Sequence, residues 1–132
     1  MSRIAQGTFD VTATRHPPYD AAEGLVLGRT SFVKSFQGEL EGSSTVEMLS
    51  AGTPTQGSAV YVALERVSAK LAGRSGHFVL VHHGIMNRGA PSLRLDVAPD
   101  SGVGELVGLA GRMQIEIKDG RHFYRFEYDL AE

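Results

Sequence analysis

The chain contains no cysteine among its 132 residues. This absence excludes disulfide bonds, thiolate metal sites and a cysteine nucleophile. The chain also has no run of basic residues, because its 13 Lys and Arg are interleaved with 15 Asp and Glu and leave a formal net charge of -2. Binding to nucleic acid through phosphate contacts is therefore not expected.

Long apolar runs are missing as well. No stretch approaches the length of a signal-peptide core or a membrane span, so we expect a cytoplasmic protein without a membrane partner. Low-complexity tracts are absent, and 42% of the residues are hydrophobic. A chain of this length can bury a substantial core, and residues 1–132 are expected to form a single domain.

What the sequence does contain is a series of strand-like segments separated by turn signals. Each segment is rich in Val, Ile, Thr, Phe and Tyr, and the 16 glycines recur between segments. We predict eight strands, at residues 7–14, 25–37, 38–51, 58–71, 77–87, 92–98, 113–118 and 122–130. Asp119-Gly120 predicts a tight hairpin between the last two. Residues 60–71 also permit a helix, because Leu64, Val67 and Leu71 recur at helical spacing.

The connections favour an all-β fold with antiparallel neighbours, since none is long enough to hide a crossover helix. We predict a closed antiparallel eight-stranded meander barrel, because closure removes the exposed strand edges of an open sheet. Residues 77–87 are apolar on both faces, which indicates that the outer face is covered too. A homo-oligomer would cover that face, and the loop around Pro17 and Pro18 is the alternative.

A candidate site emerges from the faces that side chains share. Tyr61 and Glu65 lie on one face of their strand, and His82 shares a face with Phe78 and Leu80 on the next strand. We predict that Tyr61, Glu65 and His82 are polar contacts inside the barrel, and that Phe78, Leu80 and Met48 are apolar walls. The alternatives are a rim position for Glu65, paired with an arginine, and a hydrogen-bonded core histidine at His82.

Metal and cofactor sites are not predicted. His82 and His83 are adjacent on a strand and face opposite sides, and His77 is too far along the strand to share a metal with His83. Neither a nucleophile elbow, a phosphate loop nor a dinucleotide fingerprint occurs in a fitting context. The glycine-rich residues 100–105 lack the ligand spacing of a calcium loop, so we interpret them as a turn.

Three segments carry a family resemblance that extends over nearly the whole chain: GSAVYVALERV at 57–67, GRSGHFVLVHHG at 73–84 and PDSGVGELVGLAG at 99–111. They resemble a family of small bacterial domains of unknown function, which is similar to the allene-oxide-cyclase-like barrels that include plant dirigent proteins. The resemblance implies an eight-stranded barrel with an apolar interior, in a superfamily whose members cyclise or orient small hydrophobic ligands and commonly form oligomers. No catalytic motif of the cyclases can be matched in this chain, and a shared fold does not imply a shared reaction.

Three functional hypotheses follow from the sequence. The first is binding of a small apolar or amphipathic molecule in the barrel interior. The second is an isomerase or cyclase that folds a hydrophobic substrate there, with Glu65 or His82 transferring a proton. The third is a structural or protein-interaction module that uses its apolar outer face. The residues alone do not decide whether the protein is an enzyme.

Overall fold

The structure is a computed structural model that describes residues 2–131. It contains the strands β1 (Arg3–Arg15), β2 (Val26–Gly38), β3 (Leu40–Gly52), β4 (Ala59–Leu71), β5 (Arg74–Asn87), β6 (Ala90–Val97), β7 (Val103–Gly104), β8 (Ala110–Lys118) and β9 (Arg121–Asp129). The eight long strands correspond to the eight predicted segments. The short β7, which the sequence analysis did not predict, pairs with the beginning of β5.

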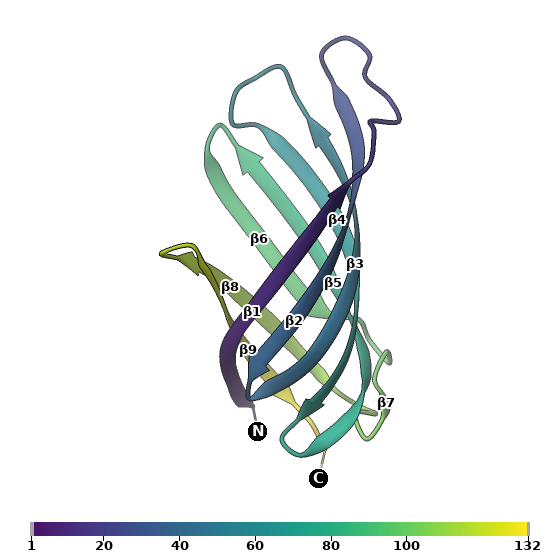
Figure 1. Cartoon of the computed structure of the whole chain (residues 1–132), viewed down its shortest axis with the longest axis vertical. Coiled ribbons are helices and arrows are strands. Elements are labelled where there is room, and N and C mark those ends of the chain that lie inside the picture. The colour runs from purple at the N-terminus through teal and green to yellow at the C-terminus, as the bar shows by residue number, and fades with distance from the viewer. Residues whose placement is uncertain (1, 132) are drawn as a thin grey trace.

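The long strands form one closed barrel in meander order, as Figure 1 shows. Each pairs antiparallel with the next along the chain, β6 passes directly to β8, and β9 returns to pair with β1. The predicted closed antiparallel eight-stranded barrel is thus confirmed. Residues 60–71 lie in strand β4, so the helical alternative is wrong, because β3 and β5 both pair with this segment along its length.

Two-residue turns set the register of three hairpins. Both central residues of each turn have positive φ, as a type I′ turn requires. The three turns are Ala72-Gly73 between β4 and β5, Arg88-Gly89 between β5 and β6, and Asp119-Gly120 between β8 and β9. The hairpin predicted at Asp119-Gly120 is therefore confirmed.

A tyrosine on β9 forms hydrogen bonds with the turn between β2 and β3. Tyr124 on β9 accepts a hydrogen bond from the Leu40 backbone N–H at 2.9 Å. Its own hydroxyl lies 3.0 Å from the carbonyl oxygen of Gln37 and 2.9 Å from that of Leu40, so it can donate to either. The Tyr124 hydroxyl thus satisfies backbone groups of Gln37 and Leu40 at the turn.

One half of the barrel is filled by its own side chains. Phe78, Phe126 and Leu71 are fully enclosed, and Phe78 stacks on Phe126 with ring centroids 5.8 Å apart. The segment between β6 and β8 adds Leu106 and Leu109 to the same core. The filled half is at the end of the barrel where β1 begins and β9 ends, at the bottom of Figure 1.

The second half of β5 has an outer face that the chain's own loops do not cover, whereas β7 pairs with the beginning of this strand. Val81 and Ile85 are 38% and 40% exposed, and His83 between them is exposed as well. The alternative that the loop around Pro17 and Pro18 covers this face is therefore wrong. The sequence pattern is apolar on both faces of β5, but at Val81 and Ile85 the outer face is left exposed within one chain.

Candidate functional site

The inward-facing side chains change from buried to exposed at one level of the barrel. On β5, Leu80 is buried whereas Met86 is 40% exposed, and on β6 Leu95 is buried whereas Leu93 is 46% exposed. On β8, Met113 is buried whereas Ile117 faces the same side and is exposed. Beyond this level the chain's own side chains do not fill the interior. The barrel is therefore filled below this level and open above it, and we refer to the open part as the cup.

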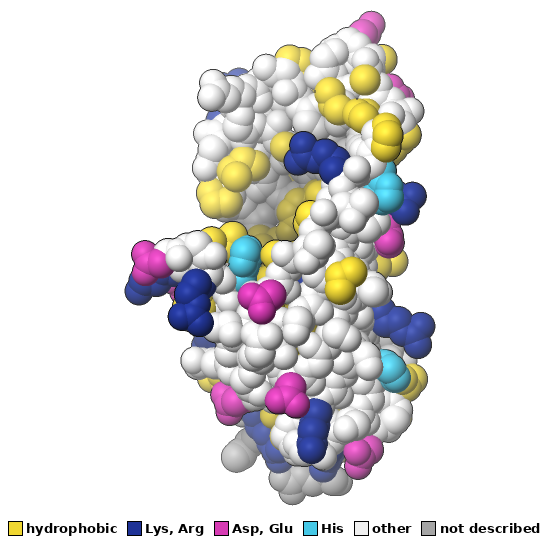
Figure 2. Space-filling model, viewed as in Figure 1, with side chains coloured by type: hydrophobic (Ala, Val, Ile, Leu, Met, Phe, Trp, Pro, Cys, Tyr) yellow, Lys and Arg dark blue, Asp and Glu magenta, His cyan; other side chains and the backbone are white. Residues whose placement is uncertain are grey.

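The cup opens because the wall is incomplete on one side. β6 and β8 are joined only through the pairs Leu95–Met113 and Asp96–Arg112. The pairing of β9 with β1 likewise ends at Phe9, so the rest of β1 has only β2 as a neighbour. Figure 2 shows the result as a hollow surrounded by hydrophobic side chains, above the projecting end of the β8–β9 hairpin.

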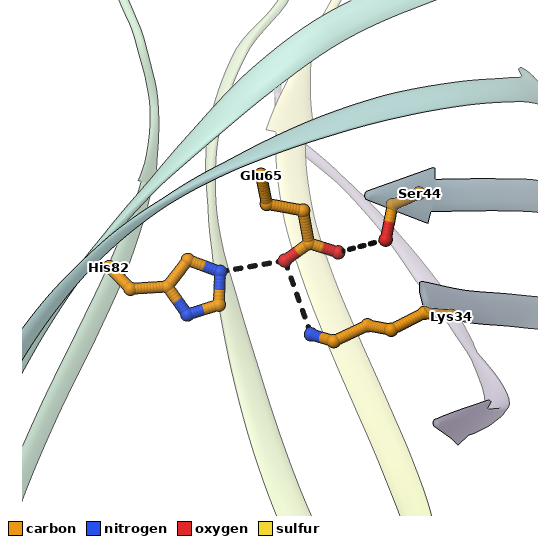
Figure 3. Close-up of polar contacts among 4 residues, drawn as sticks. All are labelled: Lys34, Ser44, Glu65 and His82. Atoms are coloured by element: carbon orange, nitrogen blue, oxygen red, sulfur yellow. Dashed lines mark hydrogen bonds and ion pairs between the residues drawn. The ribbon is translucent and has the colours of Figure 1, made fainter. Parts of the chain in front are cut away.

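A single polar network lies at the level where the filled half ends. In the part of the chain that the structure describes, four polar or charged residues are buried, Lys34, Ser44, Glu65 and His82, and all four are connected. Glu65 on β4 is the centre (Figure 3). Its Oε1 lies 3.1 Å from Lys34 Nζ and 2.6 Å from His82 Nε2, and its Oε2 accepts a 2.6 Å hydrogen bond from Ser44 Oγ.

The pattern of strand pairing explains why these four side chains meet. Lys34 pairs directly with Ser44 across β2 and β3, and His82 pairs with Ala63 across β5 and β4. Glu65 is two residues from Ala63 and therefore points into the same interior. All four side chains consequently converge from four adjacent strands on one point inside the barrel.

Glu65 is held as a carboxylate despite its enclosure. Burial alone would raise the pKa of Glu65, but the hydrogen bond from His82, the charge of Lys34 and the hydrogen bond from Ser44 together hold that pKa below its usual range. Because an ionised carboxylate only accepts hydrogen bonds, His82 Nε2 must carry the proton in the 2.6 Å contact.

The lysine of this network packs against aromatic rings. Lys34 Nζ is 4.8 Å from the centroid of Phe9 and 6.0 Å from that of Phe36. These ring faces stabilise a cation that has left water, in addition to the ion pair with Glu65. Lys34 was missed by the sequence analysis, although its place between Phe32 and Phe36 on one strand face is a signal that could have found it.

Tyr61 lies one layer above the network, toward the open side. Its ring lies against Gly84 on β5, where an added Cβ would come within 2.1 Å of a ring carbon, so the absence of a side chain at Gly84 makes room for the ring. The ring centroid is 6.4 Å from that of His82. Burial and the nearby charge of Glu65 raise the pKa of Tyr61, so its hydroxyl is neutral.

The six predicted site residues occupy three different environments. Tyr61, Glu65 and His82 all face the interior and lie together, and Met48 is half-buried on the inner face of β3 in the cup. Phe78 and Leu80 are fully enclosed in the filled half. Leu80, the strand partner of Glu65, packs below the network, and Phe78 belongs to the core. Ser44 and Lys34 are additional members that the sequence analysis did not name.

A second hollow lies on the outer face of β1, β9 and β8, with a volume of about 880 Å³. The charged residues in its lining, Glu116, Lys118 and Arg125, are all exposed. It therefore lacks the enclosed charged group that distinguishes the cup. Glu116 faces solvent, as its alternation with Ile115 and Ile117 suggests.

The comparisons with known proteins agree with this fold. Residues 5–128 match the family model described as "Protein of unknown function (DUF3224)". The chain belongs to this family. It is 47% identical to a DUF3224 protein of unknown function from Shewanella oneidensis MR-1 whose crystal structure is known; the match covers 100% of both chains with a TM-score of 0.93. No curated protein matches the chain in sequence.

The DUF3224 assignment confirms the family expected from the sequence, whereas the likeness to allene-oxide-cyclase barrels stays a prediction. Residues 2–131 include no helix with the length and apolarity needed to cross a bilayer. In the same residues, no three His, Asp or Glu side chains are grouped so that they could hold a metal ion.

Proposed function

We propose that this DUF3224 protein binds a small apolar or amphipathic molecule in the open half of its barrel. One observation carries the proposal: all of the buried polar residues of the described chain lie together at the floor of a cup with mainly apolar walls. Ligand sites commonly combine apolar walls with a few convergent polar groups in this way.

The walls of the cup supply the apolar part of the site. Phe32, Met48, Met86, Leu93 and Ile115 face the interior above the network and are exposed or only half-buried. Covering these side chains with a ligand would remove apolar surface from water, which is favourable by about 25 cal/mol per Å². At the floor, Tyr61 and His82 offer polar atoms that fix the orientation of the ligand.

The neutral fluorophore 1-aminoanthracene tests the site directly. We expect its fluorescence to rise on binding to the wild-type protein, and Met86→Lys to weaken that binding about tenfold or more, equivalent to at least about 1.4 kcal/mol. Val62→Lys is the matched control, because Val62 is 51% exposed on the outer face of β4. Loss of binding in Val62→Lys with no change in Met86→Lys would place the probe outside the barrel and refute the proposal.

Retained small molecules provide an independent test. Protein purified gently from its native host is extracted with solvent, and the extract is compared by mass spectrometry with that of Met86→Lys. A compound present at near-stoichiometric amount only in the wild type supports the proposal. The proposal also includes the cytoplasmic location expected from the sequence, which cell fractionation tests.

A further inference from the structure

We propose that His82 accepts the proton of a weakly acidic hydroxyl group, a phenol or an enol, on the ligand in the cup. This inference rests on the proposed ligand site and assigns the chemistry of its floor. It concerns the ring nitrogen of His82 that does not face Glu65.

The network fixes which nitrogen of His82 is available. Nε2 donates to the Glu65 carboxylate at 2.6 Å, and this contact fixes the tautomer: when the ring is neutral, the unprotonated lone pair is on Nδ1. Nδ1 has no hydrogen-bond partner among the described residues. His77 Nδ1 is the only fully enclosed side-chain N or O atom of these residues without a partner, so His82 Nδ1 is not fully enclosed. His82 is 5% exposed and Leu80, on the filled side of it, is fully enclosed, so we infer that the exposed part of the ring faces the cup.

The charge balance of the floor favours a neutral donor over an anion. Lys34 already pairs with Glu65, and Glu65 already accepts hydrogen bonds from Ser44 and His82. No uncompensated cation remains in this network to attract a carboxylate ligand, whereas Nδ1 of the neutral His82 ring can accept a hydrogen bond from a donor. A hydroxyl group on an apolar body meets both conditions.

Glu65 also allows the proton to move. When the ligand O–H bond breaks and an N–H bond forms at Nδ1, the electron pair stays on the ligand oxygen and His82 becomes an imidazolium. The adjacent carboxylate stabilises that cation, and Lys34 and Ser44 prevent the carboxylate from turning away. The Tyr61 ring lies 6.4 Å from that of His82 and faces the same interior, so we propose that its neutral hydroxyl donates to the ligand oxygen.

The probe for this inference is 4-nitrophenol, whose neutral and ionised forms differ in absorption. At a pH where the free phenol is mostly neutral, we expect the bound phenol to show the ionised spectrum and to displace 1-aminoanthracene at least about tenfold better than nitrobenzene, which lacks the hydroxyl. His82→Gln is the test variant, because its amide can still donate to Glu65 but offers no basic nitrogen. We expect this variant to bind 4-nitrophenol in its neutral form.

Three outcomes would overturn the inference. They are equal displacement by 4-nitrophenol and nitrobenzene, an ionised spectrum that persists in His82→Gln, and displacement by octanoate that exceeds displacement by 4-nitrophenol. In each case 1-aminoanthracene binding that depends on Met86 would still stand. Failure of the hydroxyl assignment is therefore distinguishable from failure of the ligand site itself.

From a different observation, we infer that two copies of the chain associate through the outer face of β3, β4 and β5. Six aliphatic side chains, 38% to 60% exposed, form one patch there: Leu49, Val60, Val62, Leu64, Val81 and Ile85. They are contiguous, because Val62 pairs with Leu49, Leu64 with Val81 and Val60 with Ile85. We refer to them as the outer apolar patch.

The size of the outer apolar patch fits a dimer. Half-exposed side chains of this kind present on the order of 450 Å² together, within the range of the largest patch on a typical monomer. Two patches facing each other would remove about 900 Å² from water, so rims that add roughly 300 Å² would bring the total to the lower end, about 1,200 Å², of stable interfaces. The rim carries Glu47 and Arg66, charges of both signs, which suits a surface that must match itself.

Light scattering coupled to size-exclusion chromatography tests this second inference. We expect twice the 14.2 kDa chain mass for the wild type at tens of micromolar, and the mass of one chain for Val62→Lys. Val33→Lys is the control, because Val33 is 57% exposed on the outer face of β2 but is not part of the patch. A monomeric wild type, or a Val62→Lys protein that keeps the doubled mass, would contradict the inference.

Discussion

Replacing Lys34 with methionine isolates the energetic role of the buried network. Lys34 Nζ lies 3.1 Å from Glu65 Oε1, and the two side chains are 8% and 0% exposed. Methionine fills a similar volume beside Phe9 but leaves the carboxylate without its cation. Breaking an enclosed ion pair from one side typically destabilises a protein by about 3–5 kcal/mol, and we expect Lys34→Met to lose about that much free energy of unfolding.

The double variant Lys34→Met/Glu65→Gln separates this explanation from simple loss of packing. The amide that replaces the Glu65 carboxylate is neutral and can still accept from Ser44, so the double variant should be more stable than Lys34→Met alone, within about 1–2 kcal/mol of the wild type. Urea unfolding followed by far-ultraviolet circular dichroism gives both values, since the chain has no tryptophan to serve as a fluorescence probe. A loss below about 1 kcal/mol in Lys34→Met, or additive losses in the double variant, would refute the reasoning.

Three further predictions concern the same framework. Contacts hold the pKa of Glu65 low against the effect of burial. The stability that Glu65 contributes is therefore present above its unfolded pKa and is lost as pH falls through its folded pKa. We expect the urea midpoint to decline less steeply with falling pH in Glu65→Gln than in the wild type. Tyr124→Phe leaves the Leu40 N–H without its 2.9 Å partner and should lower the free energy of unfolding by about 1–3 kcal/mol in urea unfolding curves. An unchanged free energy of unfolding would contradict this role of the hydroxyl. Gly84→Ala forces the Tyr61 ring to move, so we expect the free energy of unfolding to fall by about 1–3 kcal/mol and 1-aminoanthracene binding to weaken. Unchanged binding would show that Tyr61 does not contribute to the ligand site.

The placement of Tyr61, Glu65 and His82 inside the barrel could be predicted because strand side chains alternate between faces. Their proximity required the register as well. A two-residue turn at Ala72-Gly73 pairs Leu71 with Arg74. Counting away from the turn along β4 and β5 then brings Ala63 opposite His82. The turn is visible in the sequence, so this contact was within reach of the same reasoning.

Other features depend on contacts between distant segments and could not be predicted from local pattern. The division into a filled and an open half arises where β6 and β8 part after two pairs and β9 stops pairing at Phe9. Phe78 and Leu80 look the same as Met48 in the sequence, as apolar residues on inward faces. Only the level at which the wall opens places the first two in the core and the third in the cup.

The composition of the cup floor itself argues for a role beyond folding. A buried ion pair with two further hydrogen-bonding partners is often no more stabilising than well-packed apolar residues of similar volume, because desolvation offsets the attraction. In this barrel the neighbouring layers are filled with Phe78, Leu80 and Leu95, so apolar packing at the level of Glu65 is available to the fold. The charged group lies instead at the one level where the enclosed core meets open space. At that level Glu65 holds His82 through one ring nitrogen and leaves the other without a protein partner among the described residues, which supports the proposed binding of a molecule in the cup.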